Sequence, residues 1–243
     1  MDAAIKVENL KKSYGNITVL NDVNISVKRG EVFGLLGANG AGKSTAIECI
    51  LGTRKPDKGR VRILGMDPAE DRKKLFENVG VQFQESSCQD NILVSELCEE
   101  TQCLYKNTAD YKALLGQFGL SEKIKSPVSA LSGGQKQRLF IVLSLIPNPK
   151  VVFLDELTTG LDTKARRDVW KCLSQLKEKG LTIFLTSHFM DEVEALCDKI
   201  MILKKGNTVF SGTIKEAVEN SPYKNFEDVY LWYAEEETAD ENI

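Results

Sequence analysis

Apolar and polar residues alternate in two segments near the start of the chain, a pattern typical of strands that bury one face. The first segment covers residues 5–10 and the second covers residues 19–27, with Tyr14 and Gly15 in the turn between them. Residues 32–36 then form an apolar run, Val-Phe-Gly-Leu-Leu, which predicts a short buried strand. We therefore expect a small antiparallel layer followed by a buried sheet.

The second half of the chain alternates between buried strands and amphipathic helices. Four apolar residues at 151–154 and a further apolar run at 182–186 predict two core strands. Residues 163–179 carry apolar side chains at every third or fourth position and are followed by Gly180, which predicts a helix with a glycine stop. The other elements expected here are a helix over 190–197, a hairpin over 199–210 and helices over 214–218 and 226–233.

Residues 90–120 interrupt this alternation, because they lack a strand pattern and carry their apolar side chains at helical spacing. We expect a single α/β domain over residues 1–243, with a mixed or parallel sheet and an N-terminal antiparallel β layer. Its core would comprise residues 1–88 and 148–221, with an inserted helical subdomain at 89–147. Residues 222–243 would form a C-terminal helix and an acidic tail.

The composition excludes several classes of protein. A formal net charge of −3 gives no sign of the basic surface of a general nucleic-acid-binding protein, so we expect no nucleic-acid partner. No apolar run reaches the about 18–20 residues needed to cross a bilayer, and the start of the chain lacks the pattern of a secretory signal. The six cysteines include no pair with the C-x₂-C spacing of a zinc or redox site. A soluble, unexported chain with reduced thiols is expected.

Residues 37–45 read Gly-Ala-Asn-Gly-Ala-Gly-Lys-Ser-Thr and fit the phosphate-loop template between a strand and a helix. Lys43 can bring a positive charge to the outer phosphates of a nucleotide, and the Ser44 hydroxyl can ligate Mg²⁺. The candidate phosphate-binding residues are Gly37, Ala38, Asn39, Gly40, Ala41, Gly42, Lys43, Ser44 and Thr45. A chance glycine-rich turn is the alternative, but the flanking strand and helix favour a P-loop NTPase core.

Asp155 and Glu156 directly follow the buried strand expected at 151–154. This position places both carboxylates at the edge of an α/β sheet where ligands bind. Asp155 is predicted to lie beside Mg²⁺, and Glu156 to orient and deprotonate the water that attacks the terminal phosphate. Two solvated acids at the end of a strand are the alternative.

Residues 131–135 read Leu-Ser-Gly-Gly-Gln, ending at Gln135, and precede a predicted helix. Ser132 could cap that helix while Gly133 and Gly134 expose N–H groups at its positive end, which would form a second anion site. A flexible turn is the alternative. Taken with the P-loop, the pentapeptide resembles the signature of the ATP-binding subunits of the ATP-binding cassette (ABC) superfamily. The resemblance extends from Tyr14 to at least His188.

This resemblance implies ATP and Mg²⁺ as cofactors and assigns roles to further residues. Tyr14 is similar to an aromatic residue that stacks on the adenine ring. Gln84 resembles the glutamine that contacts Mg²⁺ and water, although Gln82, two residues earlier on the same side of the strand, is an alternative. Asp162 resembles a residue of the loop that lines the dimer interface, and His188 the switch histidine that contacts the γ-phosphate.

In the family, two subunits face each other head to tail, so Ser132 and Gly134 of one copy are expected to complete the γ-phosphate site of a second copy or a paralogous subunit. The resemblance implies an ATP hydrolase that dimerises on ATP and powers transport by a separate integral membrane permease, at the cytoplasmic face of the cell membrane. The short insert and the C-terminal segment resemble those of drug and antibiotic exporters with ABC-2-type partners. Export of a drug, antibiotic or lipid-like compound is therefore expected.

The sequence leaves two other functions open, and it departs from the family pattern at one residue. A soluble ABC ATPase acting in translation or DNA maintenance is the main alternative, which a single cassette without sustained heptads disfavours. A non-hydrolysing, ATP-gated interaction protein is the third, against which Glu156 and His188 argue. Leu157 stands where the family usually has proline, so we expect a turn of changed rigidity with intact chemistry.

Overall fold

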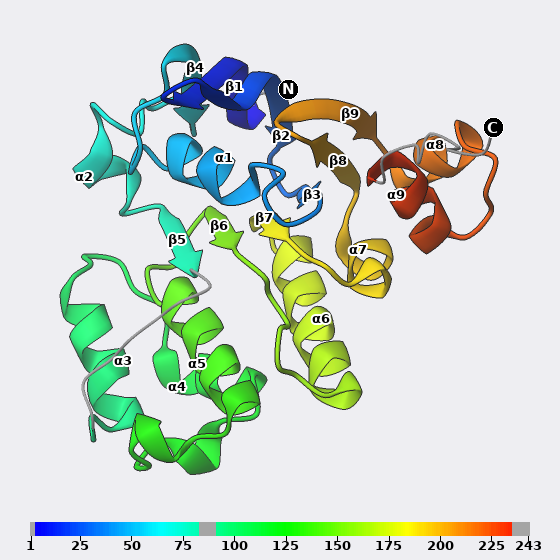
Figure 1. Ribbon diagram of the computed structural model, residues 1–243. Helices are drawn as coiled ribbons and strands as arrows, with labels where there is room; N and C mark the ends of the chain where they lie inside the picture. Colours follow the sequence, from blue (N-terminus) through cyan, green and yellow to red (C-terminus); the bar gives the residue numbers. More distant parts are fainter. Residues whose placement is uncertain (1–2, 83–90, 235–243) are drawn as a thin grey trace, which may run out of the picture.

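The computed structural model describes residues 3–82 and 91–234, which form a layered α/β fold (Figure 1). Within these residues six strands build the central sheet in the order β5-β6-β7-β3-β8-β9. Their bounds are β3 Val32–Leu36, β5 Val79–Gln82, β6 Val151–Leu154, β7 Thr182–Thr186, β8 Lys199–Lys204 and β9 Asn207–Gly212. The first five are parallel and β9 is antiparallel to β8, so the predicted α/β class with a mixed sheet is confirmed.

Each face of the central sheet is covered by its own layer, because side chains of successive strand residues point to opposite faces. On one face the rings of Phe33 and Phe153 pack on Phe184 at centroid distances of 5.4 and 5.1 Å, in a core shared with α1 (Lys43–Ile50). On the other face Val152 and Ile183 share a core with α5 (Gly133–Leu145) and α6 (Thr163–Glu178). Burial on both faces explains why these strands are apolar throughout.

A second sheet lies over α1 and has the order β2-β1-β4, with β1 at Ala3–Tyr14, β2 at Ile17–Lys28 and β4 at Lys58–Ile63. This is the predicted antiparallel layer, but simple alternation fails within it. Asn9 and Asp22 have positive φ (50° and 55°), and the Asn9 amide donates to the Asp22 carboxylate at 2.7 Å. The shift in register at this point turns Leu20 into the core, three residues before the buried Val23.

The helices α3 (Val94–Cys103), α4 (Tyr111–Gln117) and α5 gather at one end of the molecule, in green in Figure 1. Two short 3₁₀ turns, Ser121–Lys123 and Val128–Ala130, connect α4 with α5. The α5 helix also packs against the central sheet. The division into a core and a helical insert at residues 89–147 stays a prediction.

Three helices close the fold beside β8: α7 (Met190–Leu196), α8 (Ile214–Glu219) and α9 (Phe226–Ala234). They share a small core that contains Val193, Phe226 and Val229. A further short helix, α2 (Arg72–Leu75), precedes β5. In the part of the chain that the structure describes, no helix is long and apolar enough to span a membrane.

Candidate active site

A cleft of about 730 Å³ opens where strands β3, β6 and β7 end. Parallel strands end at the same edge of a sheet, so residues far apart in the sequence meet there. The lining residues are Tyr14, Val19, Asn39, Gly40, Gly42, Lys43, Ser44, Thr45, Asp155, Glu156 and His188. All of these except Val19 are candidates from the sequence. Val19 belongs to β2, and its strand pattern alone gave no signal of a place in the cleft.

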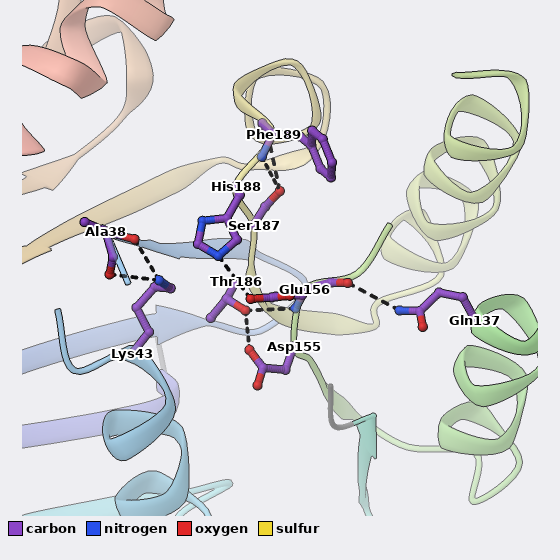
Figure 2. Close-up of polar contacts among 10 residues, drawn as sticks. Ala38, Lys43, Gln137, Asp155, Glu156, Thr186, Ser187, His188 and Phe189 are labelled. Carbon is purple, nitrogen blue, oxygen red and sulfur yellow. Dashed lines mark hydrogen bonds and ion pairs between the residues drawn. The ribbon is translucent and has the colours of Figure 1, made fainter. Parts of the chain in front are cut away.

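The P-loop is held in place by close backbone approaches. Gly42 has a φ of 106°, and a Cβ atom there would lie 2.7 Å from the Val19 carbonyl oxygen, so a side chain at this position is excluded. Lys43 is 8% exposed and its Nζ donates to the carbonyl oxygens of Gly37 (2.7 Å) and Ala38 (3.2 Å) (Figure 2). Gly37, Ala38 and Ala41 form the loop without lining the cleft.

Burial lowers the pKa of Lys43, while the carboxylates of Glu156 and Asp155 act in the opposite direction. The loop therefore holds a buried lysine whose charge is only partly compensated by these acids. A buried charge is costly unless it is paired. The outer phosphates of a nucleotide would supply the missing negative charge.

Asp155 and Glu156 are both tied to Thr186, the last residue of β7. The Thr186 hydroxyl donates to Asp155 Oδ1 at 2.5 Å and accepts a hydrogen bond from the Glu156 backbone N–H at 3.0 Å (Figure 2). Burial raises the pKa of Asp155, against the hydrogen bond from Thr186 and the charge of Lys43, which lower it. Thr186 was missed in the sequence, although its place at the end of the strand next to β6 was a usable signal.

The cleft also fits Mg²⁺. The Ser44 hydroxyl and the Asp155 carboxylate both line it, and oxygen atoms are the ligands that Mg²⁺ prefers. The half-buried Asp155 carboxylate has a raised pKa, so its ionised form gains from a nearby cation. Among residues 3–82 and 91–234, no group of three or more His, Cys, Asp or Glu side chains could hold a metal ion.

Glu156 and His188 contact each other in the cleft, because they follow the adjacent strands β6 and β7. His188 Nε2 lies 3.0 Å from Glu156 Oε1 (Figure 2). The Glu156 backbone has a φ of 51°, in a region that residues with side chains rarely occupy and that is common at functional sites.

The turn after Glu156 is hydrogen-bonded to helix α5. Gln137 on α5 donates to the carbonyl oxygens of Glu156 (3.3 Å) and Leu157 (2.9 Å), and the Leu157 side chain is fully buried. Gln137 was not a candidate, because nothing in the helical pattern distinguishes it from other half-buried positions of α5. The expected change in rigidity at Leu157 stays a prediction.

The signature residues lie outside the cleft. Ser132 caps α5, since its Oγ accepts from the Gln135 N–H (3.3 Å) and Gln135 Oε1 accepts from the Ser132 N–H (3.0 Å). Asp162 caps α6 by accepting from the Ala165 N–H at 2.8 Å. None of the residues Ser132, Gly133, Gly134, Gln135 and Asp162 lines the cleft of the same chain.

The glutamine assignment is left open by the geometry. Gln84 lies outside the described residues. The alternative, Gln82, is the last residue of β5 and is buried. Its backbone carbonyl oxygen accepts a hydrogen bond from the Asp155 backbone N–H at 3.1 Å.

Comparison with known proteins agrees with this geometry. Residues 20–159 match the ABC transporter family. The chain is 36% identical over 221 residues to the Nod factor export ATP-binding protein I of Rhizobium etli, covering 89% of this chain and 70% of that protein. It is 36% identical over 214 residues to the linearmycin resistance ATP-binding protein LnrL of Bacillus subtilis, covering 86% and 69%.

Solved structures agree as well. An ATP-binding subunit of an ABC transporter superimposes with a TM-score of 0.87 at 27% identity, over 95% of this chain and 99% of that one. The dimeric structure of the bacterial ABC transporter cassette MJ0796 superimposes with a TM-score of 0.76 at 27% identity, over 86% and 98%. With a family match over more than half of its length and the cleft described above, this chain belongs to the ABC transporter family, as one of its ATP-binding, ATP-hydrolysing subunits.

Proposed function

We propose that the cleft binds MgATP and hydrolyses it to drive export through a separate membrane subunit. The observation that carries the proposal is the convergence of Lys43, Glu156 and His188 in one cleft, with His188 Nε2 3.0 Å from Glu156 Oε1. The backbone N–H groups of residues 37–45 would surround the phosphates, and Tyr14 would stack on the adenine ring.

Hydrolysis in this site needs a positioned water and stabilised phosphate charge. A water oxygen attacks the γ-phosphorus, its proton passes to the Glu156 carboxylate, and the bond to the leaving ADP oxygen breaks. His188 orients Glu156 and contacts the γ-phosphate, and Lys43 stabilises the charge on the phosphate oxygens. Ser44, Asp155 and Gln84 would hold Mg²⁺, and the ion would supply further charge neutralisation.

Two copies are proposed to complete the site. Ser132 is exposed and Gly134 half-buried at the positive end of α5, and both lie outside the cleft of their own chain, so they are available to the γ-phosphate bound by a second copy. The MJ0796 cassette was determined as a dimer. In this arrangement Asp162 lies in the loop at the dimer interface, and hydrolysis removes the phosphate that bridges the two copies.

An exporter is the transport class that the relatives favour. The relatives above are named for Nod factor export and for resistance to linearmycin, and both names denote ATP-binding proteins. The partner is then an integral membrane permease that carries a drug, antibiotic or lipid-like compound, with this chain at the cytoplasmic face.

Phosphate release from ATP tests the enzymatic part. We expect Glu156→Gln to lower kcat by roughly 10²–10⁴-fold, the usual contribution of a general base, while ATP affinity is kept. Glu194→Gln, an exposed glutamate on α7, is the matched control. Unchanged turnover in Glu156→Gln would remove Glu156 from the mechanism.

Purification from membranes tests the coupled function. We expect an integral membrane protein to be recovered with the chain in detergent. Recovery of ribosomes or DNA in its place would favour a soluble ABC ATPase of translation or DNA maintenance.

A further inference from the structure

Two positive charges contact the ring of Tyr14. The Arg54 guanidinium carbon lies 5.3 Å from the ring centroid and Lys12 Nζ lies 5.6 Å from it. Tyr14 lines the cleft, whereas Arg54 and Lys12 do not. The cations therefore contact the ring without lining the cleft.

Both cations are attached to the same short segment, residues 54–57, that follows α1. Lys12 Nζ bonds to the Lys55 carbonyl oxygen and to Asp57 Oδ1, each at 2.9 Å. Asp57 Oδ2 accepts from the Ser13 N–H at 2.7 Å, directly before Tyr14 in the chain. The end of β1 that carries Tyr14 is thus tied to the segment that carries Arg54.

Arg54 is itself fixed from α1. Its Nε lies 2.5 Å from Glu48 Oε2, and its backbone N–H donates to the Glu48 carbonyl oxygen at 3.1 Å. A long arginine side chain otherwise samples many rotamers, and pairing at both the backbone and the side chain restricts it to one place over the ring. Glu48 therefore sets the position of the guanidinium.

This fixed contact matters because Tyr14 is 41% exposed and ends a strand. An exposed aromatic side chain loses rotamer freedom when a ligand binds to it, and this loss weakens binding. A guanidinium held against the ring removes that freedom in advance and leaves the ring surface within the cleft accessible.

We propose that Arg54, held by Glu48, is a positioning residue for base recognition: it fixes the Tyr14 ring so that the ring presents one face to the purine base of the nucleotide. This inference rests on the proposed stacking of adenine on Tyr14. The segment after the P-loop helix then contributes to binding of the base, whereas the P-loop itself binds the phosphates.

The role makes a selective prediction. Loss of Arg54 weakens the binding of every ligand that contains the base and leaves the binding of ligands made only of phosphate unchanged. It raises KM for ATP without changing kcat, because Arg54 does not line the cleft that contains Glu156 and His188. A merely structural role would alter both constants, or the thermal stability, together.

The experiment compares Arg54→Ala, Arg54→Lys and Glu48→Gln with wild type. KM and kcat for ATP are measured by phosphate release, and the inhibition constant of tripolyphosphate with Mg²⁺ serves as the probe without a base. Arg54→Ala is expected to raise KM roughly 2–5-fold, the range for a lost cation–π contact at an exposed site, with kcat and the tripolyphosphate constant unchanged. Arg54→Lys and Glu48→Gln are expected to give smaller increases. Lys58→Ala, an exposed lysine on β4, is the charge-matched control.

The outcomes separate the inference from the function on which it rests. An unchanged KM in Arg54→Ala, or an equal weakening of tripolyphosphate, overturns the role of Arg54. Tyr14→Ala reports on the stacking itself: unchanged ATP affinity in that variant removes the base platform and the inference with it. Equilibrium dialysis of ATP with the same variants in the Glu156→Gln background compares their affinities without turnover. If the wild-type protein does not hydrolyse ATP, the proposed function fails, but this binding measurement still tests the role of Arg54.

Discussion

At the scale of single residues, Thr186 organises both acids of the site. Its hydroxyl donates a hydrogen bond to the Asp155 carboxylate and accepts one from the Glu156 backbone N–H. One side chain therefore positions the Asp155 carboxylate and the Glu156 backbone, which has a positive φ. A side chain of equal shape without the hydroxyl would remove a hydrogen-bond partner from both groups in a half-buried place, which costs more than the net value of the hydrogen bonds.

We expect Thr186→Val to lower kcat for ATP about 10–100-fold, with a smaller change in KM, because a hydrogen bond to a charged group is worth about 1.5–3 kcal/mol. Phosphate-release kinetics measures both constants. Thr182→Val is the matched control, since Thr182 is a buried threonine at the opposite end of β7 whose Oγ1 accepts from the Gly30 N–H. Equal losses of kcat in the two variants would contradict a specific role for Thr186.

At the scale of elements, Glu192 on α7 joins three segments of the chain. It is 0% exposed, and its Oε1 accepts from the Thr158 hydroxyl (2.7 Å) and from the Trp170 indole N–H (3.0 Å) on α6. Thr158 lies between Glu156 and Asp162, and His188 lies just before α7. Burial raises the pKa of Glu192, while the hydrogen bonds from Ser187, Thr158 and Trp170 lower it.

The raised pKa predicts how the stability of the protein changes with pH. The folded state binds the Glu192 proton more tightly than the unfolded chain, so this stabilisation is complete below the ordinary pKa of 4.5 and is lost as the pH rises through the folded pKa. Glutamine does not titrate, so the Tm of Glu192→Gln relative to wild type should rise with pH, by about 2–4 °C for each kcal/mol. Thermal melts from about pH 4 to 8 measure this. A flat difference, like that of the exposed control Glu194→Gln, would show that Glu192 does not carry the effect.

Elements were also the level at which sequence reasoning worked best. The apolar runs at 151–154 and 182–186 have the bounds of β6 and β7, because a strand buried on both faces reads as a short, continuous apolar run. Leu20 could not be placed, since the bulge at Asn9 and Asp22 depends on a side-chain pair from two strands. Gln137 was missed because its partners, the carbonyl oxygens of Glu156 and Leu157, are backbone groups, and no sequence pattern shows which side chain a backbone group contacts.

At the scale of the whole molecule, the cleft and the exposed residues at the start of α5 lie on different parts of one chain. Within a head-to-tail dimer each site would take Lys43 from one copy and Ser132 from the other. The arrangement is symmetric, so both sites of a homodimer would be composite.

Mixing two inactive variants tests this arrangement. Lys43→Ala and Ser132→Arg should each abolish most turnover, yet a mixed dimer contains one site that avoids both substitutions. Random pairing then restores roughly a quarter of the wild-type sites. Phosphate release by the refolded or co-expressed mixture measures the recovery. Activity that never exceeds that of the separate variants would place a complete site within each chain.

The order of strands in the central sheet has a consequence for biosynthesis. The strand β3, which leads into the P-loop, is made early but lies between β7 and β8, whose last residue is Lys204. During synthesis on the ribosome, β3 is translated long before its partners β7 and β8, so both of its edges stay unpaired in the unfinished chain. Prematurely terminated products that end before residue 182 therefore lack His188 as well as both strands that pair with β3, so they lack a residue of the cleft and the support of the strand that leads into the P-loop.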